Sequence, residues 1–358
     1  MPVNIRSRAF LVPLAHKTLR FLITSGVPLI AAYTYGFGSW VLYLILGAIL
    51  SFVGDAGGPP WLRLGFMAIG PASIGVGALI GTLCFFGQAH GLFFCVAVVV
   101  GMIYALVENR HGHMVMVPRF VGYGLVFGYS VTQINRLDVL LLAAALIWSW
   151  LVAMIWDLVM REKRPFSVPS LRRSILLGYV HAPMRWRLAV STGIAVGLAL
   201  LTTVFTGNKH AYWTMLTMLI VLHYNIRESA LQITRRITGT LIGVFFVILL
   251  VSLHATPLQL LLAGLLITIL RWPAFALHSG LGTACITAFV LLLAEMSAPS
   301  GSNQMQVLID RLLATFIGCA FSLFTLEVDY FLRHVMLAWE KLKQSFRRGG
   351  HGNETPPT

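Results

Sequence analysis

Charge is scarce in this chain. Only 11% of its 358 residues are charged, whereas 58% are hydrophobic and the mean hydropathy is +0.82. This composition argues against a water-soluble globular protein. Uninterrupted apolar runs recur from Thr18 to Phe331, which argues against a β-barrel, because barrel strands alternate polar and apolar residues over short segments. The sequence therefore predicts an all-α, polytopic membrane helix bundle.

Signatures of catalysis and nucleotide binding are also missing. No G-x-x-x-x-G-K-[ST] loop occurs, so we do not expect ATP-driven pumping by this chain alone. No Ser/His/Asp or metalloprotease spacing is present, and the four cysteines lie in apolar runs without the spacing of metal ligands. We therefore predict no enzyme activity and no catalytic residue, and we expect no cofactor and no metal.

The charge that is present is strongly basic, with 26 Lys and Arg against 12 Asp and Glu. It concentrates in short segments between apolar runs, which is the pattern of topology determinants, so we expect no nucleic-acid partner. If the N-terminus is inside, only Arg136, Lys209 and Arg311 fall on the outer side. This asymmetry predicts a multi-pass membrane protein with both termini in the cytoplasm.

Apolar segments long enough to cross a bilayer occur in two groups of six. The twelve predicted spans are 18–36, 39–54, 64–86, 89–107, 116–132, 137–159, 187–206, 212–224, 228–253, 257–271, 273–294 and 309–331. A charged, proline-containing segment between the groups is predicted to be a cytoplasmic linker with a short surface helix at 171–180. The predicted domains are a cytoplasmic N-terminus at 1–17, a first repeat at 18–159, the linker at 160–186, a second repeat at 187–331 and a basic cytoplasmic tail at 332–358, disordered at its end.

Short motifs recur in the same order in both halves. Gly77-Ala-Leu-Ile-Gly81 in the third predicted span matches Gly239-Thr-Leu-Ile-Gly243 in the ninth. Three weaker matches accompany it: Ile134-Asn-Arg-Leu137 with Ile309-Asp-Arg-Leu312, Trp40 with Trp213, and Pro118 with Pro273 near the start of each fifth span. Because each half has an even number of spans, we predict two parallel six-helix repeats, related by an axis along the membrane normal.

The ninth predicted span begins with a polar stripe. At 100° per residue, one face of this helix carries Gln232, Arg235, Arg236, Gly239 and Gly243. Two readings of the arginines are open: they lie within the bilayer and face the protein interior, or they flank a shorter span at the cytoplasmic surface.

The internal repeat bears on this choice. Aligning Gly77–Gly81 with Gly239–Gly243, which we call the glycine register, pairs Arg235 and Arg236 with Ser73 and Ile74, well inside the third span. A competing register, based on the equal spacings Trp40–Arg63 and Trp213–Arg236, keeps the arginines at the surface. We favour the glycine register, because it aligns five consecutive positions.

The segment from Tyr212 to Gly243, YWTMLTMLIVLHYNIRESALQITRRITGTLIG, resembles the signature of the fusaric-acid-resistance family of integral membrane transporters. Arg311-Leu-Leu-Ala-Thr315-Phe-Ile-Gly318 is similar to the closing R-x-x-x-T-x-x-G helix of that family. These motifs cover 209–330, and the first half fits only through the internal repeat. Many members carry a large cytoplasmic domain after a six-span unit, which the 27-residue linker here is too short to supply.

This resemblance implies passage of organic anions, because the same superfamily includes bacterial aromatic-acid exporters and plant aluminium-activated malate channels. It also implies an arginine-lined path between the two repeats, with Arg235, Arg236 and Arg311 as its candidates. Guanidinium groups suit this task, because they stay charged and can hold both oxygens of a carboxylate. The substrate-binding prediction also includes Gln232 and both glycines, Gly239 and Gly243, with Thr315 on the last span. Structural roles remain open as the alternative, with Arg235 paired to Glu228 and the glycines serving only in packing.

The predicted function is export of organic anions, aromatic or hydrophobic carboxylic acids. A passive anion channel and a membrane scaffold that transports nothing are the alternatives. Coupling to protons would need a titrating group, for which the candidates are Glu228, His223, His278 and Glu295. The expected partners are a small organic anion and the lipid bilayer, while a periplasmic adaptor protein and a homo-oligomer remain open.

Overall fold

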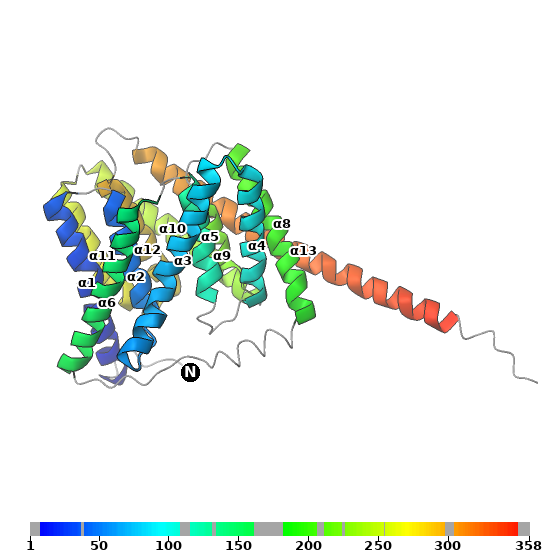
Figure 1. The fold of residues 1–358 in the computed structure, drawn as a ribbon, viewed down its shortest axis with the longest axis horizontal. Coiled ribbons are helices and arrows are strands. Elements are labelled where there is room, and N and C mark those ends of the chain that lie inside the picture. The colour runs from blue at the N-terminus through cyan, green and yellow to red at the C-terminus, as the bar shows by residue number, and fades with distance from the viewer. Residues whose placement is uncertain are drawn as a thin grey trace, which may run out of the picture.

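The computed structural model describes residues 8–36, 39–107, 115–130, 134–160, 182–205, 211–223, 226–253, 255–297 and 304–349. These residues form twelve α-helices and no β-strand, which confirms the predicted all-α class (Figure 1). The first group is α1 Arg8–Tyr35, α2 Ser39–Val53, α3 Pro60–Phe86, α4 His90–Val107, α5 Met116–Ser130 and α6 Arg136–Met160. The second group is α8 Ala182–Phe205, α9 Ala211–Val221, α10 Ile226–Ser252, α11 Pro257–Leu277, α12 Ser279–Ser297 and α13 Gln304–Gly349.

Each predicted span coincides with one of these helices. Six of the described helices contain segments that are long and apolar enough to cross a membrane. These segments are Pro60–Phe86, His90–Val107, Arg136–Met160, Arg227–Ser252, Pro257–Leu277 and Leu308–Trp339. The chain is therefore a multi-pass helical membrane protein.

The boundary between the tenth and eleventh predicted spans is wrong. Pro273 lies inside α11, which continues to Leu277, and the break comes at His278. A proline within a membrane helix removes one backbone hydrogen bond without ending the helix, whereas His278 has an extended backbone (φ −153°, ψ 127°). The imidazole of His278 then accepts a hydrogen bond from the Gly280 N–H at 3.2 Å, close to the start of α12. Pro273 is thus not at the start of a fifth helix and does not match Pro118.

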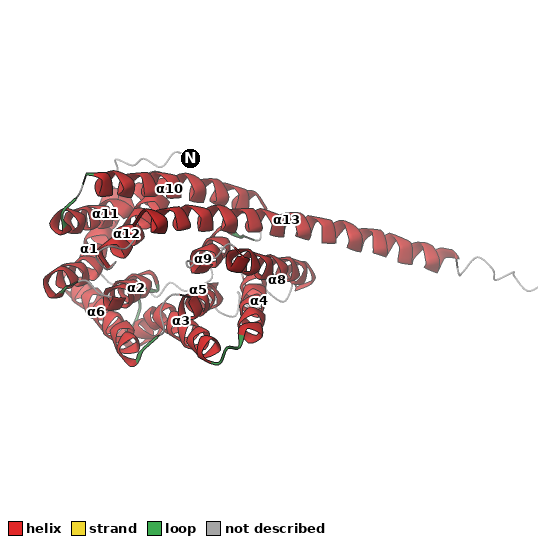
Figure 2. Ribbon diagram, turned by 90° about the horizontal axis from the view of Figure 1, so that it is seen from above, coloured by secondary structure: helices red, strands yellow, loops and turns green. Residues whose placement is uncertain are grey.

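The terminal helices are longer than predicted. Helix α1 begins at Arg8, ten residues before the predicted span, and α13 is one continuous helix of 46 residues. Figures 1 and 2 show the last part of α13 extending away from the bundle, where a separate basic tail was predicted after 331. The predicted surface helix at 171–180 and the end of the predicted tail, 350–358, lie outside the described residues.

Equivalent helices pack against equivalent neighbours in the two halves. Within the first half α3 packs against α5 and α2 against α6, and within the second half α10 packs against α12 and α9 against α13. Across the halves α4 packs against α8, and α11 packs against α1 in the same way. Seen from above, α10 and α13 run side by side along one edge (Figure 2). We propose that the halves are duplicated units, since the same contacts recur between equivalent helices in both halves.

The repeated glycines make the closest of these helix contacts. A Cβ atom added to Gly77 or Gly81 would lie 2.2 or 2.1 Å from a backbone carbonyl oxygen of α5. A Cβ atom added to Gly239 or Gly243 would lie 2.6 or 2.7 Å from a carbonyl oxygen of α12. Backbone-to-backbone approach of this kind requires glycine, and it is how membrane helices gain packing energy without a hydrophobic driving force.

Substituting alanine for Gly81 is expected to destabilise the bundle, because its Cβ would force α3 away from the Leu125 carbonyl. Overpacking of this kind costs about 1–3 kcal/mol. Gly65, on the same helix, is the matched control, because its Cβ would meet no atom within 4 Å. There, helix propensity favours alanine by about 1 kcal/mol. Thermal unfolding in detergent checks both variants, and equal midpoints would contradict the proposed contact.

Candidate functional site

A cavity of about 400 Å³ lies between the two halves of the bundle. Its wall includes residues of α1, α2, α3 and α5 from the first half and of α9 to α13 from the second. The polar and aromatic side chains of the wall are Phe21, Arg119, Phe120, Tyr123, His223, Gln232, Arg236, Thr268, Arg271, Phe275, Thr283, Phe289 and Arg311. The rest of the wall consists of Leu, Ile and Val side chains. We call this space the central cavity.

Arg236 lies deep in the wall of this cavity. It is ten residues after Ile226, the first residue of α10, which places it about 15 Å along the helix at the usual rise per residue. Its side chain is only 5% exposed, and its Nε has no hydrogen-bond partner among the described residues. Ile74, its counterpart in the glycine register, lines the same cavity from α3. The two positions therefore face the same cavity.

Arg311 reaches the cavity from the second half as well. It lies on α13, is 1% exposed, and is among the largest fully buried side chains of the described residues. Asp310 beside it is also buried. Thr315, which was predicted to bind substrate with Arg311, does not line the cavity. Its hydroxyl instead donates a hydrogen bond to the Arg311 carbonyl oxygen at 2.9 Å, one turn back along the same helix.

Two further arginines, Arg119 and Arg271, line the cavity and were missed by the sequence analysis. Arg119 of α5 donates a hydrogen bond from Nη2 to the Tyr104 hydroxyl at 3.1 Å. Arg271 of α11 lies over the Phe21 ring, with its guanidinium carbon 4.6 Å from the ring centroid. A signal for Arg271 was present, because it interrupts the apolar segment from Leu258 to Leu277. The tenth predicted span, 257–271, ended at this arginine, and Pro273 was taken as the start of the next span.

The other residues of the predicted stripe on α10 separate in the structure. Gln232 lines the cavity together with Arg236, whereas Arg235 is half-buried outside it. Gly239 and Gly243 face the backbone of α12 and do not line the cavity. A stripe about 100° wide thus serves two purposes, with one edge facing the cavity and the other packing against a helix.

Among the four candidates for proton coupling, His223 alone is placed in the cavity wall by the described residues. Glu228 is half-buried in the first turn of α10, away from the cavity. His278 is exposed, and its ring accepts the backbone hydrogen bond at the start of α12. Glu295 belongs to α12, but its side chain lies outside the described part of the chain.

The electrostatics of the cavity favour anions. Four guanidinium groups line it, and its described wall contains no Asp or Glu. In a site of low dielectric, cationic side chains lower the barrier for an anion and reject cations. The aromatic and aliphatic groups around them can hold the apolar part of an organic molecule, as in most small-molecule sites. The arrangement is therefore chemically suited to a carboxylate attached to a hydrophobic body.

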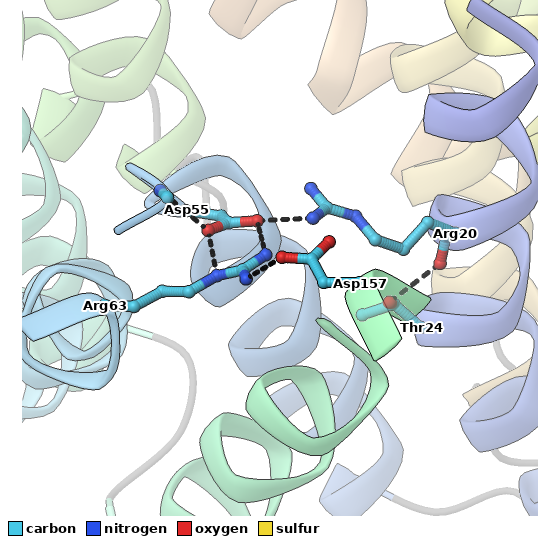
Figure 3. A network of polar contacts seen from close by, with 6 residues as sticks. Arg20, Thr24, Asp55, Arg63 and Asp157 are labelled. Atoms are coloured by element: carbon cyan, nitrogen blue, oxygen red, sulfur yellow. Dashed lines mark hydrogen bonds and ion pairs between the residues drawn. The ribbon is translucent and has the colours of Figure 1, made fainter. Parts of the chain in front are cut away.

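A separate ionic cluster lies in the first half, where Asp55 sits between two arginines (Figure 3). Arg63 donates to both Asp55 oxygens, at 2.5 Å from Nε and 2.7 Å from Nη2, and it also donates from Nη1 to Asp157. Arg20 pairs with the same Asp55 carboxylate. The cluster joins α1, α3 and α6 to the connection between α2 and α3, so it acts as a structural tie rather than as part of the cavity.

The environment of Asp55 favours its charged form. Burial by itself raises the pKa of this carboxyl, but the hydrogen bonds from Arg63 and the charges of Arg20 and Arg63 outweigh burial and hold the pKa below its ordinary value. The second half has a smaller counterpart, in which Arg187 of α8 contacts Asp329 of α13 at 2.6 and 3.3 Å.

Fold and cavity together define a class: a multi-pass helical membrane protein with a cation-lined cavity between two six-helix halves. The comparisons with known proteins agree with this class. Residues 194–325 match the model of the family described as fusaric acid resistance protein-like, which is the family that the sequence motifs resemble.

One curated relative is the uncharacterized protein slr1298 of Synechocystis sp., which is 26% identical over 137 residues. The match covers 38% of this chain and 17% of that protein, so the chain spans about a sixth of the length of the relative it matches. No solved structure matches the chain.

Proposed function

We propose that this protein exports organic anions, aromatic or hydrophobic carboxylic acids, through the central cavity. The observation that carries the proposal is the convergence of Arg119, Arg236, Arg271 and Arg311 on one space with no acidic residue in its described wall. A cavity of about 400 Å³ has room for a small aromatic acid. Its size is also in the range of about 300–1,000 Å³ usual for ligand pockets.

The proposed binding mode divides the substrate between two kinds of side chain. Arg236 and Arg311 hold the carboxylate, because both are buried and a planar fork can donate to both oxygens. Aromatic walls such as Phe289 and Tyr123 contact the apolar body. Gln232, on the same face as Arg236, adds a neutral hydrogen-bonding group.

Placement in a bacterial inner membrane, with both termini in the cytoplasm, is part of the proposal. It rests on the Lys and Arg residues, 14 of 26 of which lie in the predicted N-terminal segment, linker and tail at 1–17, 160–186 and 332–358. Export is the direction proposed from the efflux role of the family. Whether a periplasmic adaptor or a second copy of the chain takes part stays open.

We expect His223→Gln to remove the dependence of transport on a pH gradient, because imidazole is the side chain that changes charge near neutral pH and His223 lines the cavity. His278→Gln is the matched control, since that ring is exposed and caps a helix. Carboxylate flux into proteoliposomes, with and without a pH gradient, checks both. Unchanged gradient dependence in His223→Gln would contradict the assignment.

The same flux assay tests the function itself. Purified protein in liposomes should move aromatic or dicarboxylic acids, and empty liposomes should not. Steady anion current that ignores the pH gradient would indicate a passive channel instead of a coupled exporter. Absence of carboxylate movement from a folded preparation, together with a co-purifying membrane partner, would favour the scaffold.

A further inference from the structure

A second cavity, of about 440 Å³, lies at the end of the bundle where α1 begins and α2 ends. Three basic or titratable side chains of α1 line it, His16, Lys17 and Arg20. Two aromatic side chains, Phe52 of α2 and Trp272 of α11, form another part of the wall. Asp55 also lines it and is held by the ionic cluster described above. We call this space the vestibule.

Three aromatic rings lie between the vestibule and the central cavity. Phe21 lines the central cavity, whereas Phe52 and Trp272 line the vestibule. The ring centroids of Phe21 and Phe52 are 5.1 Å apart, and each lies 5.9 Å from the centroid of Trp272. Phe21 is only 1% exposed. We call these three rings the aromatic barrier.

Cationic groups hold this barrier from both sides. On the side of the central cavity, the Arg271 guanidinium carbon is 4.6 Å from the Phe21 centroid and 5.2 Å from the Trp272 centroid. On the side of the vestibule, Lys17 Nζ is 3.6 Å from the Trp272 centroid. Arg20 contacts the third ring, with its guanidinium carbon 4.5 Å from the Phe52 centroid.

We propose that the vestibule is a second anion site in series with the central cavity, and that the aromatic barrier controls passage between them. The proposal rests on the proposed transport function for the identity of the ligand, an organic carboxylate. It goes beyond that function by naming where the anion binds first and which side chains separate the two sites.

The barrier and the anion compete for the same cations. A carboxylate in the vestibule attracts Lys17, and a carboxylate in the central cavity attracts Arg271. Either shift weakens a cation–π contact that holds Trp272 or Phe21 in place. The rings meet edge to face or tilted, so their positive edges can also contact the anion as it passes. Binding on either side is thereby coupled to opening of the barrier.

Thiol labelling tests whether the aromatic barrier controls access to the central cavity, and it does not require the protein to transport a substrate. The reporter is Ile220→Cys, on α9 in the wall of the central cavity, in a protein whose four natural cysteines are replaced. A membrane-impermeant, anionic methanethiosulfonate is added to the membrane face at which α1 begins, and the labelling rate is measured. Phe21→Ala should raise this rate by about tenfold or more, since the rate follows the fraction of open molecules. The Phe21→Tyr variant should be labelled at the same rate as the reporter protein that keeps Phe21.

Phe246→Ala is the matched control, because Phe246 is a partly buried phenylalanine of α10 that lines neither cavity and is not one of the three barrier rings. Its rate should equal that of the unchanged barrier. Trp272→Leu repeats the test if Phe21→Ala does not fold, and reagent added to the opposite face should label all variants alike. The proposal would be overturned by fast labelling with the barrier intact or by no acceleration in Phe21→Ala or Trp272→Leu. Equal acceleration in Phe246→Ala would also overturn it. Labelling needs no flux, so it separates failure of the barrier from failure of the transport function.

Discussion

Arg236→Gln is expected to abolish most carboxylate transport, whereas Arg235→Gln leaves it largely intact. The two arginines are adjacent in sequence and have the same helix environment, but only Arg236 lines the central cavity. Glutamine keeps the length and polarity of the side chain and removes the charge. A hydrogen bond to a charged group contributes about 1.5–3 kcal/mol, and 1.4 kcal/mol is tenfold, so we expect a loss of about 10- to 100-fold in apparent affinity or rate.

Initial rates of radiolabelled carboxylate uptake into proteoliposomes measure this difference, with reconstituted protein quantified in each sample. Arg236→Lys adds a useful comparison, because it retains the charge and loses the planar fork. Its rate should fall between those of the wild type and Arg236→Gln. Equal rates for Arg235→Gln and Arg236→Gln would contradict the assignment of Arg236 as the arginine that binds the carboxylate in the cavity.

Asp55→Asn is expected to cause the largest loss of stability. The change removes the carboxylate charge that pairs with both Arg20 and Arg63 while the two arginines stay buried, and breaking a buried ion pair in this way costs about 3–5 kcal/mol. The pKa of Asp55 lies below its ordinary value of 3.8, so the stabilisation is fully present above that pH. It is lost as the pH falls through the lower value of the folded protein. Measurements at pH 7 therefore register the whole effect.

Asp329→Asn is the matched change in the second half. The side chains of its pair with Arg187 are 12% and 15% exposed, against 1% and 2% for Arg63 and Asp55. Water compensates a more exposed charge better, so this variant should lose much less stability. Thermal unfolding in detergent at pH 7 compares the two. A larger loss of stability for Asp329→Asn would show that the ionic cluster around Asp55 does not contribute more to the stability of the bundle than the Arg187–Asp329 pair.

Most of the elements could be predicted from the sequence, because apolar runs and their charged flanks are local signals. The misplaced boundary at Pro273 arose because a proline was taken as the start of a new helix, although α11 continues through it. The candidate site was predicted in part. Helical periodicity placed Gln232 and Arg236 on one face, yet it also included Arg235, because a stripe 100° wide does not say which edge faces the cavity.

By itself, the sequence determined that this protein is a multi-pass bundle of membrane helices, because hydrophobicity and charge act over a single turn or span. Only the tertiary structure decided which side chains meet. Arg119, Arg271 and Arg311 come from three different helices, and the ion pair between Arg63 and Asp157 joins residues 94 positions apart. Convergence of this kind depends on how helices cross and rotate about their axes, which is set by long-range packing such as the glycine contacts. No local pattern in the sequence encodes it.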